Sequence, residues 1–318
     1  MKIQKRKLGN SGLEVAPVAF GGNVFGWTVD EAMAFKLLDA FVAYGFNLID
    51  TADTYSIWVP GNKGGESETI IGRWLKHSGS RKRVVIATKV GMEMGPKRKG
   101  LSKTYILRAA EDSLRRLQTD YIDLYQSHVD DPGTPLEETL DAYAQLIRQG
   151  KVRAIGASNY SAKRISESLE VSRQHGLPAY QSLQPLYNLY DRSEYEGGLQ
   201  QVCLKEGLGV ITYFSLASGF LTGKYRSKGD LAKSGRRAFV EKYLNERGLR
   251  ILDALDQVAE RFDSTLAAVS LAWVMARPGI IAPIASATNL NQLNDFVKAA
   301  NLKLDPVSIE QLNKASSY

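Results

Sequence analysis

Short apolar runs alternate with longer amphipathic stretches along the whole chain. The runs are five to eight residues long and rich in β-branched and aromatic residues, which is typical of buried β-strands. They are Val15–Gly21, Phe46–Asp50, Val84–Lys89, Tyr121–His128, Val152–Ser158, Tyr180–Gln184, Gly209–Phe214 and Ile280–Ile284. The pattern therefore predicts eight strands, of which the first is the weakest.

The stretches between these runs have the apolar spacing of helices. In Asp30–Tyr44, for example, Ala34, Leu38 and Phe41 share one helical face, an aspartate can cap the start and Gly45 can end the helix. The other predicted helices are Glu68–Lys76, Lys103–Leu117, Leu136–Arg148, Ala162–His175, Gly198–Glu206, Arg247–Phe262 and Thr265–Ala276, with Gly150, Gly176 and Gly207 as stops after three of them and a polar loop predicted over Tyr225–Val240.

Eight strands, most of them followed by a helix, are the count of an α/β protein with a (β/α)8 TIM barrel. An open doubly wound sheet usually has fewer strands and often begins with a GxGxxG turn, which follows no strand here. The segment Gly219–Lys224 resembles a phosphate-binding loop, but it is one residue short and ends in Tyr225 where Ser or Thr would bind magnesium. No Pro- or Ser-rich linker interrupts the pattern, so we expect one domain over residues 1–318.

Composition narrows the function classes. The chain has 318 residues, 44% hydrophobic and 24% charged, which is a globular balance, and its net charge is +7. The basic clusters 81–83 and 97–99 are interpreted as solvated loop charge, so a polyanionic small molecule is favoured over nucleic acid. The single Cys203 indicates a reducing compartment, and no apolar stretch is long enough for a membrane span. We therefore expect a cytoplasmic protein without a membrane partner.

Four residue types with complementary chemistry follow neighbouring strands. Asp50 and Tyr55 come from the second strand, Lys89 from the third and His128 from the fourth, and sites in such barrels form at the carboxyl ends of the strands. A lysine ammonium beside a tyrosine would stabilise the phenolate, an aspartate would hold the lysine, and a histidine could orient a carbonyl oxygen. This set is a proton donor without a covalent nucleophile, so it needs an external reductant such as a nicotinamide cofactor.

Other chemistries fit the sequence less well. A metal at His128 is conceivable, but no second histidine or cysteine lies at ligand spacing, so no metal is expected. Ser158 does not stand in the GxSxG nucleophile motif. Asp130 and Asp131 would point apart on an extended chain, which argues against a hydrolase or isomerase built on a carboxylate pair.

Over nearly the whole chain these motifs resemble the aldo-keto reductase family. The matching segments are Asn47–Tyr55, Ile86–Val90, Asp123–His128, Gly156–Tyr160 and Ser215–Tyr225. The resemblance implies that Tyr55 is the general acid in carbonyl reduction, with Asp50 and Lys89 tuning it and His128 orienting the carbonyl. It also implies an aromatic substrate pocket that includes Trp27 and Trp58, suited to small aldehydes and ketones.

The resemblance further implies a nicotinamide cofactor. Ser158, Asn159 and Gln184 would bind its carboxamide, and Tyr213 would stack on its ring. The remaining cofactor contacts implied are Gly22, Asn23, Asp50, Phe214, Ser215, Leu216, Ala217, Ser218, Gly219, Lys224, Arg237, Ser286, Thr288, Gln292 and Asp295.

One segment departs from the family pattern. The stretch Ser286–Phe296 has no basic residue where the family often grips the adenosine 2′-phosphate with Lys or Arg. Ser286, Thr288 and Gln292 can donate hydrogen bonds to a phosphate, although neutral donors contribute less than charged ones. Lys224, Arg236 or Arg237 could supply the missing charge. We therefore expect NADPH, with NADH as the alternative.

A second function class fits the same resemblance. Some relatives are cytoplasmic β subunits of potassium channels, and the Gly223-Lys224-Tyr225 segment resembles theirs. Those subunits tend to carry asparagine at the histidine position, whereas His128 is present here, so an enzyme is favoured over a cofactor-sensing interaction protein. The motifs leave open the natural carbonyl substrate, the physiological direction of the reaction and whether the chain forms a homo-oligomer.

Overall fold

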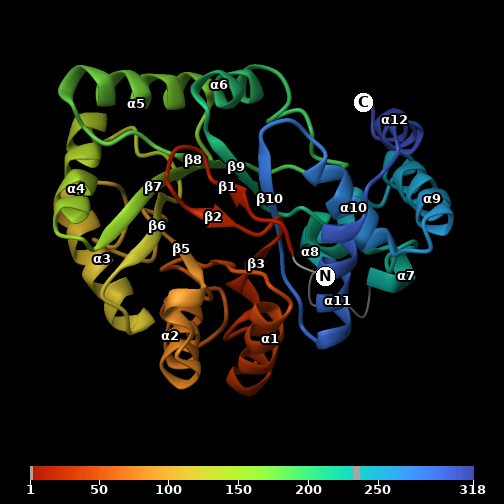
Figure 1. The fold of residues 1–318 in the computed structure, drawn as a ribbon, viewed down its shortest axis with the longest axis horizontal. Helices are drawn as coiled ribbons and strands as arrows, with labels where there is room; N and C mark the ends of the chain where they lie inside the picture. Colours follow the sequence, from red (N-terminus) through yellow and green to blue (C-terminus); the bar gives the residue numbers. More distant parts are fainter. Residues whose placement is uncertain (1–2, 232–236) are drawn as a thin grey trace.

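Eight parallel strands close into a barrel in the computed structural model, which describes residues 3–231 and 237–318. Their order around the barrel is β10-β3-β4-β5-β6-β7-β8-β9 (Figure 1). The strands are β3 (Ala19–Gly21), β4 (Leu48–Asp50), β5 (Val85–Val90), β6 (Ile122–Ser127), β7 (Val152–Ser158), β8 (Ser182–Gln184), β9 (Gly209–Thr212) and β10 (Ile280–Ala285). Each of the eight predicted runs contributes one strand to the barrel, and the predicted (β/α)8 fold is confirmed.

Helices surround the barrel on its outside (Figure 1). They are α1 (Glu31–Ala43), α2 (Glu66–Ser78), α3 (Lys103–Leu117), α4 (Leu136–Arg148), α5 (Ala162–His175), α6 (Gly198–Glu206), α7 (Lys228–Leu231), α8 (Arg237–Val240), α9 (Glu246–Arg261), α10 (Leu266–Met275), α11 (Leu290–Asn301) and α12 (Pro306–Ala315), with 3-10 turns η1 (Gly22–Val24), η2 (Ser80–Arg83), η3 (Ala217–Thr222) and η4 (Glu241–Tyr243). The side chains of Ser102, Ser161 and Thr265 cap α3, α5 and α10 by accepting from backbone N–H groups. None of the helices in the described ranges is long and apolar enough to cross a membrane.

An N-terminal hairpin covers one end of the barrel. Its strands are β1 (Arg6–Lys7) and β2 (Glu14–Val15), which pair antiparallel and lie across the barrel in Figure 1. Buried Leu8, Leu13 and Val15 pack with the inward-facing side chains of the barrel strands. The predicted single strand over Val15–Gly21 is therefore wrong, because Val15 pairs in the hairpin and only residues 19–21 join the barrel.

The structure corrects three other expectations. The segment Tyr225–Val240 was predicted as a loop, yet it contains α7 and α8, which bury Leu231 and Val240. Helix α2 begins two residues earlier than predicted, where the carboxylate of Glu66 accepts from the backbone N–H groups of residues 63 and 64. Helices α11 and α12 were not predicted, although Asn289 and Asp305 cap them.

The strand register aligns the carboxyl ends on which the predicted chemistry depends. Asp50 lies opposite Ala87 in β5, and Lys89 lies opposite Gln126 in β6. Ser158 of β7 lies opposite Gln184 of β8. Polar side chains from these adjacent strands therefore stand at one end of an otherwise apolar barrel.

Candidate active site

The four predicted catalytic side chains converge at the carboxyl end of the barrel. Asp50 ends β4, Lys89 lies in β5, His128 follows β6 and Tyr55 lies between β4 and α2. Lys89 Nζ donates to Asp50 Oδ2 at 2.6 Å and to Tyr55 Oη at 3.2 Å. The Tyr55 and His128 rings meet edge to face with centroids 5.9 Å apart. A carboxylate, an ammonium, a phenol and an imidazole thus form one contiguous group.

Two glutamines and a carbonyl complete the ion pair. Gln184 Nε2 donates to Asp50 Oδ1 at 2.8 Å, and Gln126 Nε2 donates to the same oxygen at 3.4 Å. Lys89 Nζ also donates to the backbone carbonyl of Thr51 at 2.8 Å. Both charges are buried, so these bonds offset the desolvation that a buried pair incurs and fix the position of the ammonium.

The electrostatics of Tyr55 differ from the expectation. Burial raises the pKa of the Tyr55 phenol, and the lowering effect of Lys89 is outweighed because Asp50 and Asp53 also favour the protonated form. The pKa of Lys89 is raised as well: burial opposes its charge, but Asp50 and Tyr55 stabilise it. The expected lowering effect of Lys89 on the phenol pKa is present, but burial outweighs it, so the pKa is raised overall. At neutral pH the site holds a protonated phenol against a charged ammonium.

His128 is a neutral imidazole in this setting. Burial lowers its pKa well below the usual value, and the Lys89 ammonium acts in the same direction. Its Nδ1 atom is buried without a hydrogen-bond partner among the described residues, while its backbone carbonyl accepts from Asn159 Nδ2 at 2.9 Å. A neutral imidazole can donate one hydrogen bond to a carbonyl oxygen without placing a second cation beside Lys89.

Aromatic rings stand beside Tyr55. Trp58 packs against Tyr55 and Trp27 packs against Trp58, each edge to face with centroids 5.7 Å apart. Trp58 is 45% exposed, so its ring is accessible from solvent. Of the two tryptophans predicted for the substrate pocket, Trp58 therefore neighbours the phenol, and Trp27 packs against Trp58 from a different loop.

Residues predicted to bind the cofactor carboxamide lie next to the four catalytic candidates. Ser158 Oγ donates to the Gln184 carbonyl at 2.9 Å, and Asn159 Nδ2 donates to Ser158 Oγ at 3.2 Å. Tyr213 Oη donates to Asn159 Oδ1 at 2.7 Å. The side chains of Ser158, Asn159 and Tyr213 and the backbone carbonyl of Gln184 thus form a connected polar group beside His128.

The segment after β9 has an irregular backbone. Phe214, Ala217, Ser218 and Gly219 all have positive φ angles between 47° and 96°. Ser215 is buried, and its Oγ donates to the Thr212 carbonyl at 2.9 Å. Leu216 packs partly buried against the core. Most of the predicted cofactor residues in this segment are therefore buried or packed against the core.

Only some of the residues predicted to bind the 2′-phosphate contact one another. Ser286 Oγ donates to Asn23 Oδ1 and to the Gly21 carbonyl, both at 2.7 Å. Thr288 Oγ1 donates to Gln292 Oε1 at 3.1 Å.

The other members of that set point to different partners. Asp295 accepts from Thr265 Oγ1 at 2.8 Å, and exposed Arg237 pairs with Glu241 at 3.8 Å. Lys224 lies over the Tyr225 ring at 5.0 Å. The packing around Gly22 favours glycine, because a Cβ there would lie 2.9 Å from Ser67 Oγ. Arg236 lies outside the described residues.

Comparison with known proteins identifies the family of the chain. The profile described as "Aldo/keto reductase family" matches residues 17–317. The chain belongs to the aldo/keto reductase family. It is 33% identical to "Protein tas" of Escherichia coli over 99% of both chains. It is 34% identical to "Uncharacterized oxidoreductase YrpG" of Bacillus subtilis over 96% of this chain and 94% of that protein. It is 32% identical to "Probable voltage-gated potassium channel subunit beta" of Arabidopsis thaliana over 98% and 96%.

The polar groups of this aldo/keto reductase suit a nicotinamide cofactor. Gln184 uses its amide N–H groups on Asp50 and Gln126, which leaves its side-chain oxygen to accept from a carboxamide. The half-buried Tyr213 ring stands beside that group. Where the 2′-phosphate end of the cofactor is predicted, Ser286, Thr288 and Gln292 provide neutral polar side chains. The donor and acceptor chemistry fits both ends of a dinucleotide.

Sequence reasoning missed one residue of this site, Gln126, and one buried residue beside it, Asp53. Gln126 reaches Asp50 from the strand next to Lys89, and its signal is a polar residue two positions before His128 in a buried strand. Asp53 is buried two residues before Tyr55, and neither of its carboxylate oxygens has a hydrogen-bond partner among the described residues. The sequence holds no signal for that burial, because Asp53 lies in a connection of irregular backbone.

Proposed function

We propose that this aldo/keto reductase reduces aldehydes or ketones to alcohols with NADPH, and that Tyr55 is the general acid. The observation that carries the proposal is the contact of Lys89 with both Asp50 and Tyr55, beside a neutral His128. The nicotinamide, when bound, supplies a hydride to the carbonyl carbon. Ser158, Asn159 and Gln184 would hold its carboxamide, and Tyr213 would lie against its ring.

The protein side of the reaction is proton delivery. His128 donates a hydrogen bond to the carbonyl oxygen and orients it toward Tyr55. The Tyr55 phenol then gives its proton to the oxygen as negative charge develops there. Lys89 stabilises the phenolate that remains, because its ammonium lies 3.2 Å from Tyr55 Oη. Asp50 keeps the ammonium charged and in place.

The pKa directions predict a flat pH profile for reduction. Because the pKa of His128 is well below its usual value, the imidazole stays neutral as the pH falls through about 6.5. Because the pKa of Tyr55 is raised, the phenol keeps its proton well above neutrality. We expect kcat/KM for reduction of a neutral aldehyde to be constant between about pH 6.5 and 9. A transition near pH 6.5 in kcat/KM would contradict the neutral imidazole.

The cofactor preference has its own test. We expect NADPH to bind more tightly than NADH at fixed ionic strength, as measured by fluorescence titration. Thr288→Val removes one neutral donor and should weaken NADPH binding by about fivefold, while NADH binding stays unchanged as the internal control. Tighter binding of NADH by the wild-type protein would exclude the NADPH preference.

A second function follows from the relatives named as channel subunits. This chain matches the Arabidopsis protein, and a rice protein of the same name to which it is 34% identical, over more than nine-tenths of the length of each. The alternative is a cofactor-binding interaction protein without significant turnover. A panel of aldehydes and ketones, followed by nicotinamide absorbance with both cofactors, separates the two. Cofactor binding without turnover of any carbonyl would favour the interaction protein.

A further inference from the structure

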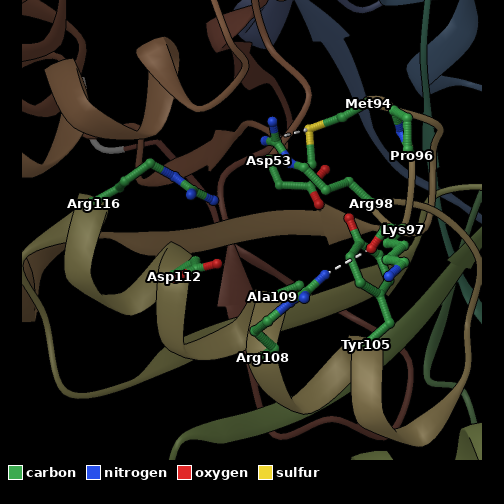
Figure 2. Close-up of a pocket in the computed structure, with 10 residues that line it drawn as sticks. All are labelled: Asp53, Met94, Pro96, Lys97, Arg98, Tyr105, Arg108, Ala109, Asp112 and Arg116. Carbon is green, nitrogen blue, oxygen red and sulfur yellow. Dashed lines mark hydrogen bonds between the residues drawn. The ribbon is translucent and has the colours of Figure 1, made fainter.

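A polar cavity lies outside the barrel strands, against α3. Its volume is about 280 Å³, and it is bounded by the β4–α2 connection, the β5–α3 connection and α3 (Figure 2). None of its lining residues belongs to the proposed catalytic, cofactor or substrate sets. We call it the α3 cavity. The proposed function does not account for it.

Two buried polar groups of the α3 cavity lack partners. Asp53 is 1% exposed, and both of its carboxylate oxygens are without a hydrogen-bond partner among the described residues. The hydroxyl of Tyr105, on α3, is also buried without such a partner, and the residue is 7% exposed. Buried polar groups are almost always hydrogen-bonded, so two such groups lining one cavity point to a ligand that completes them.

The electrostatic surroundings of both groups favour their protonated, hydrogen-bond-donating forms. Burial and the neighbouring Glu68 raise the pKa of Asp53 well above its usual value, which favours the protonated carboxyl. Burial and Asp53 raise the pKa of Tyr105 to about 12, against the lowering effect of Arg98, Arg108 and Arg116. In its protonated form each of these groups presents an O–H donor to the cavity.

Unpaired cations line the same cavity. Lys97, Arg98 and Arg108 have no carboxylate within 4.0 Å among the described residues. Arg98 donates to the Lys63 carbonyl at 3.2 Å and to the Met94 sulfur. Arg108 donates to the Lys97 carbonyl at 2.7 Å. Figure 2 draws the contacts with Met94 and Lys97 as dashed lines. Within the basic cluster 97–99, Arg98 is partly buried against the cavity, whereas Lys97 and Lys99 are exposed, as expected for solvated loop charge.

The acidic groups nearby are already neutralised by other partners. Glu68 accepts from Arg116 at 2.7 Å and from Thr88 Oγ1 at 2.5 Å. Asp112, which also lines the cavity, pairs with Arg115. The remaining side chains around the cavity therefore combine positive charge with hydrogen-bond donors.

We propose that the α3 cavity binds a phosphate group, either free phosphate or a small phosphate monoester, through Arg98, Arg108, Tyr105 and Asp53. Donors from the β4–α2 connection, the β5–α3 connection and α3 suit an anion with four oxygens, and guanidinium groups bind phosphate with charge-assisted hydrogen bonds. The volume lies below the roughly 300–1,000 Å³ of pockets for drug-sized ligands, so any organic part must be small.

The test is isothermal titration calorimetry of the full chain with inorganic phosphate, glycerol 3-phosphate and acetate at constant ionic strength. A saturating amount of NADPH is added in a parallel series, because a cofactor site can also hold phosphate. We expect saturable phosphate binding in both series. Arg98→Gln should weaken it about tenfold or more and Tyr105→Phe about three- to tenfold. Lys99→Gln, which removes the same charge from an exposed neighbour, should leave it within about twofold.

Glycerol 3-phosphate decides the source of the group: tighter binding than free phosphate supports a monoester, and equal binding supports free phosphate. Four results would overturn the proposal. They are no saturable heat with the wild-type protein, loss of the heat when NADPH is present, equal weakening by Arg98→Gln and Lys99→Gln, and binding of acetate as tight as that of phosphate. Tyr105→Phe removes only an unpartnered hydroxyl, so its fold is retained and its result stands even if the arginine variant is unstable.

Discussion

Replacing Tyr55 with phenylalanine is expected to lower kcat/KM for carbonyl reduction by about 10²- to 10⁴-fold, which is the range of one general acid. The variant removes only the hydroxyl that contacts Lys89 Nζ at 3.2 Å. The phenyl ring keeps its edge-to-face contacts with Trp58 and His128, so the fold and the cofactor affinity should not change. The measurements are single-turnover oxidation of NADPH by an aldehyde and fluorescence titration of NADPH.

A matched control separates the acid from general effects of losing a phenol. Tyr44 is 40% exposed at the end of α1, and its hydroxyl donates to Asn294 Oδ1 at 3.1 Å. Tyr44→Phe removes the same atom elsewhere and should leave reduction unchanged. If Tyr55→Phe reduces the aldehyde at the wild-type rate, Tyr55 is not the acid. If it loses cofactor binding instead, the hydroxyl has a binding role that the proposal does not contain.

The sequence predicted the convergence of the four catalytic candidates because strand ends are easy to locate. A run such as Val84–Lys89 is apolar up to Thr88, and the lysine that ends it must leave the core or find a partner. Parallel pairing of neighbouring strands then brings Lys89 beside the strand that ends in Asp50. The barrel topology thus turns positions in the sequence into neighbours in space.

Connections between elements were less predictable, since their backbone follows no period. Asp53 and Tyr55 lie two residues apart in one connection, yet one lines the α3 cavity and the other contacts Lys89. The Thr265 contact of Asp295 depends on the packing of α10 against α11, and the sequence had not predicted α11. The pKa of Tyr55 was misjudged for a related reason. The sequence indicates which charges are near, but not how strongly partial burial opposes the phenolate.

The phenol's raised pKa gives Lys89 a more specific role than simple acidification. Burial opposes the phenolate, and Lys89 is the cation that reduces this penalty. The effect matters most when the proton has left, because the phenolate then gains a full charge beside the ammonium. Lys89 therefore stabilises the reacting state more than the resting state, which is the condition for acceleration of the proton transfer.

Lys89→Met is expected to abolish most carbonyl reduction and to destabilise the protein by about 3–5 kcal/mol, because it leaves the buried Asp50 carboxylate without its cation. Urea denaturation measures the second effect. In the wild-type protein the pKa of Lys89 lies above its ordinary value, so its charge contributes fully to stability below the ordinary pKa. That contribution is lost only as the pH rises through the raised pKa of the folded state. The variant lacks this charge at every pH, so its residual reduction is not aided by it. An unchanged pH profile and rate would contradict the tuning role.

The double variant Asp50→Asn/Lys89→Met separates stability from chemistry. Removing both charges eliminates the uncompensated carboxylate, so most of the lost stability should return. Activity should not return, because Tyr55 still lacks a cation to stabilise its phenolate. Recovery of both would mean that Lys89 acts only by holding the fold. Recovery of stability alone would assign the ammonium to the proton transfer, since Gln126 and Gln184 can still hydrogen-bond the residue at position 50.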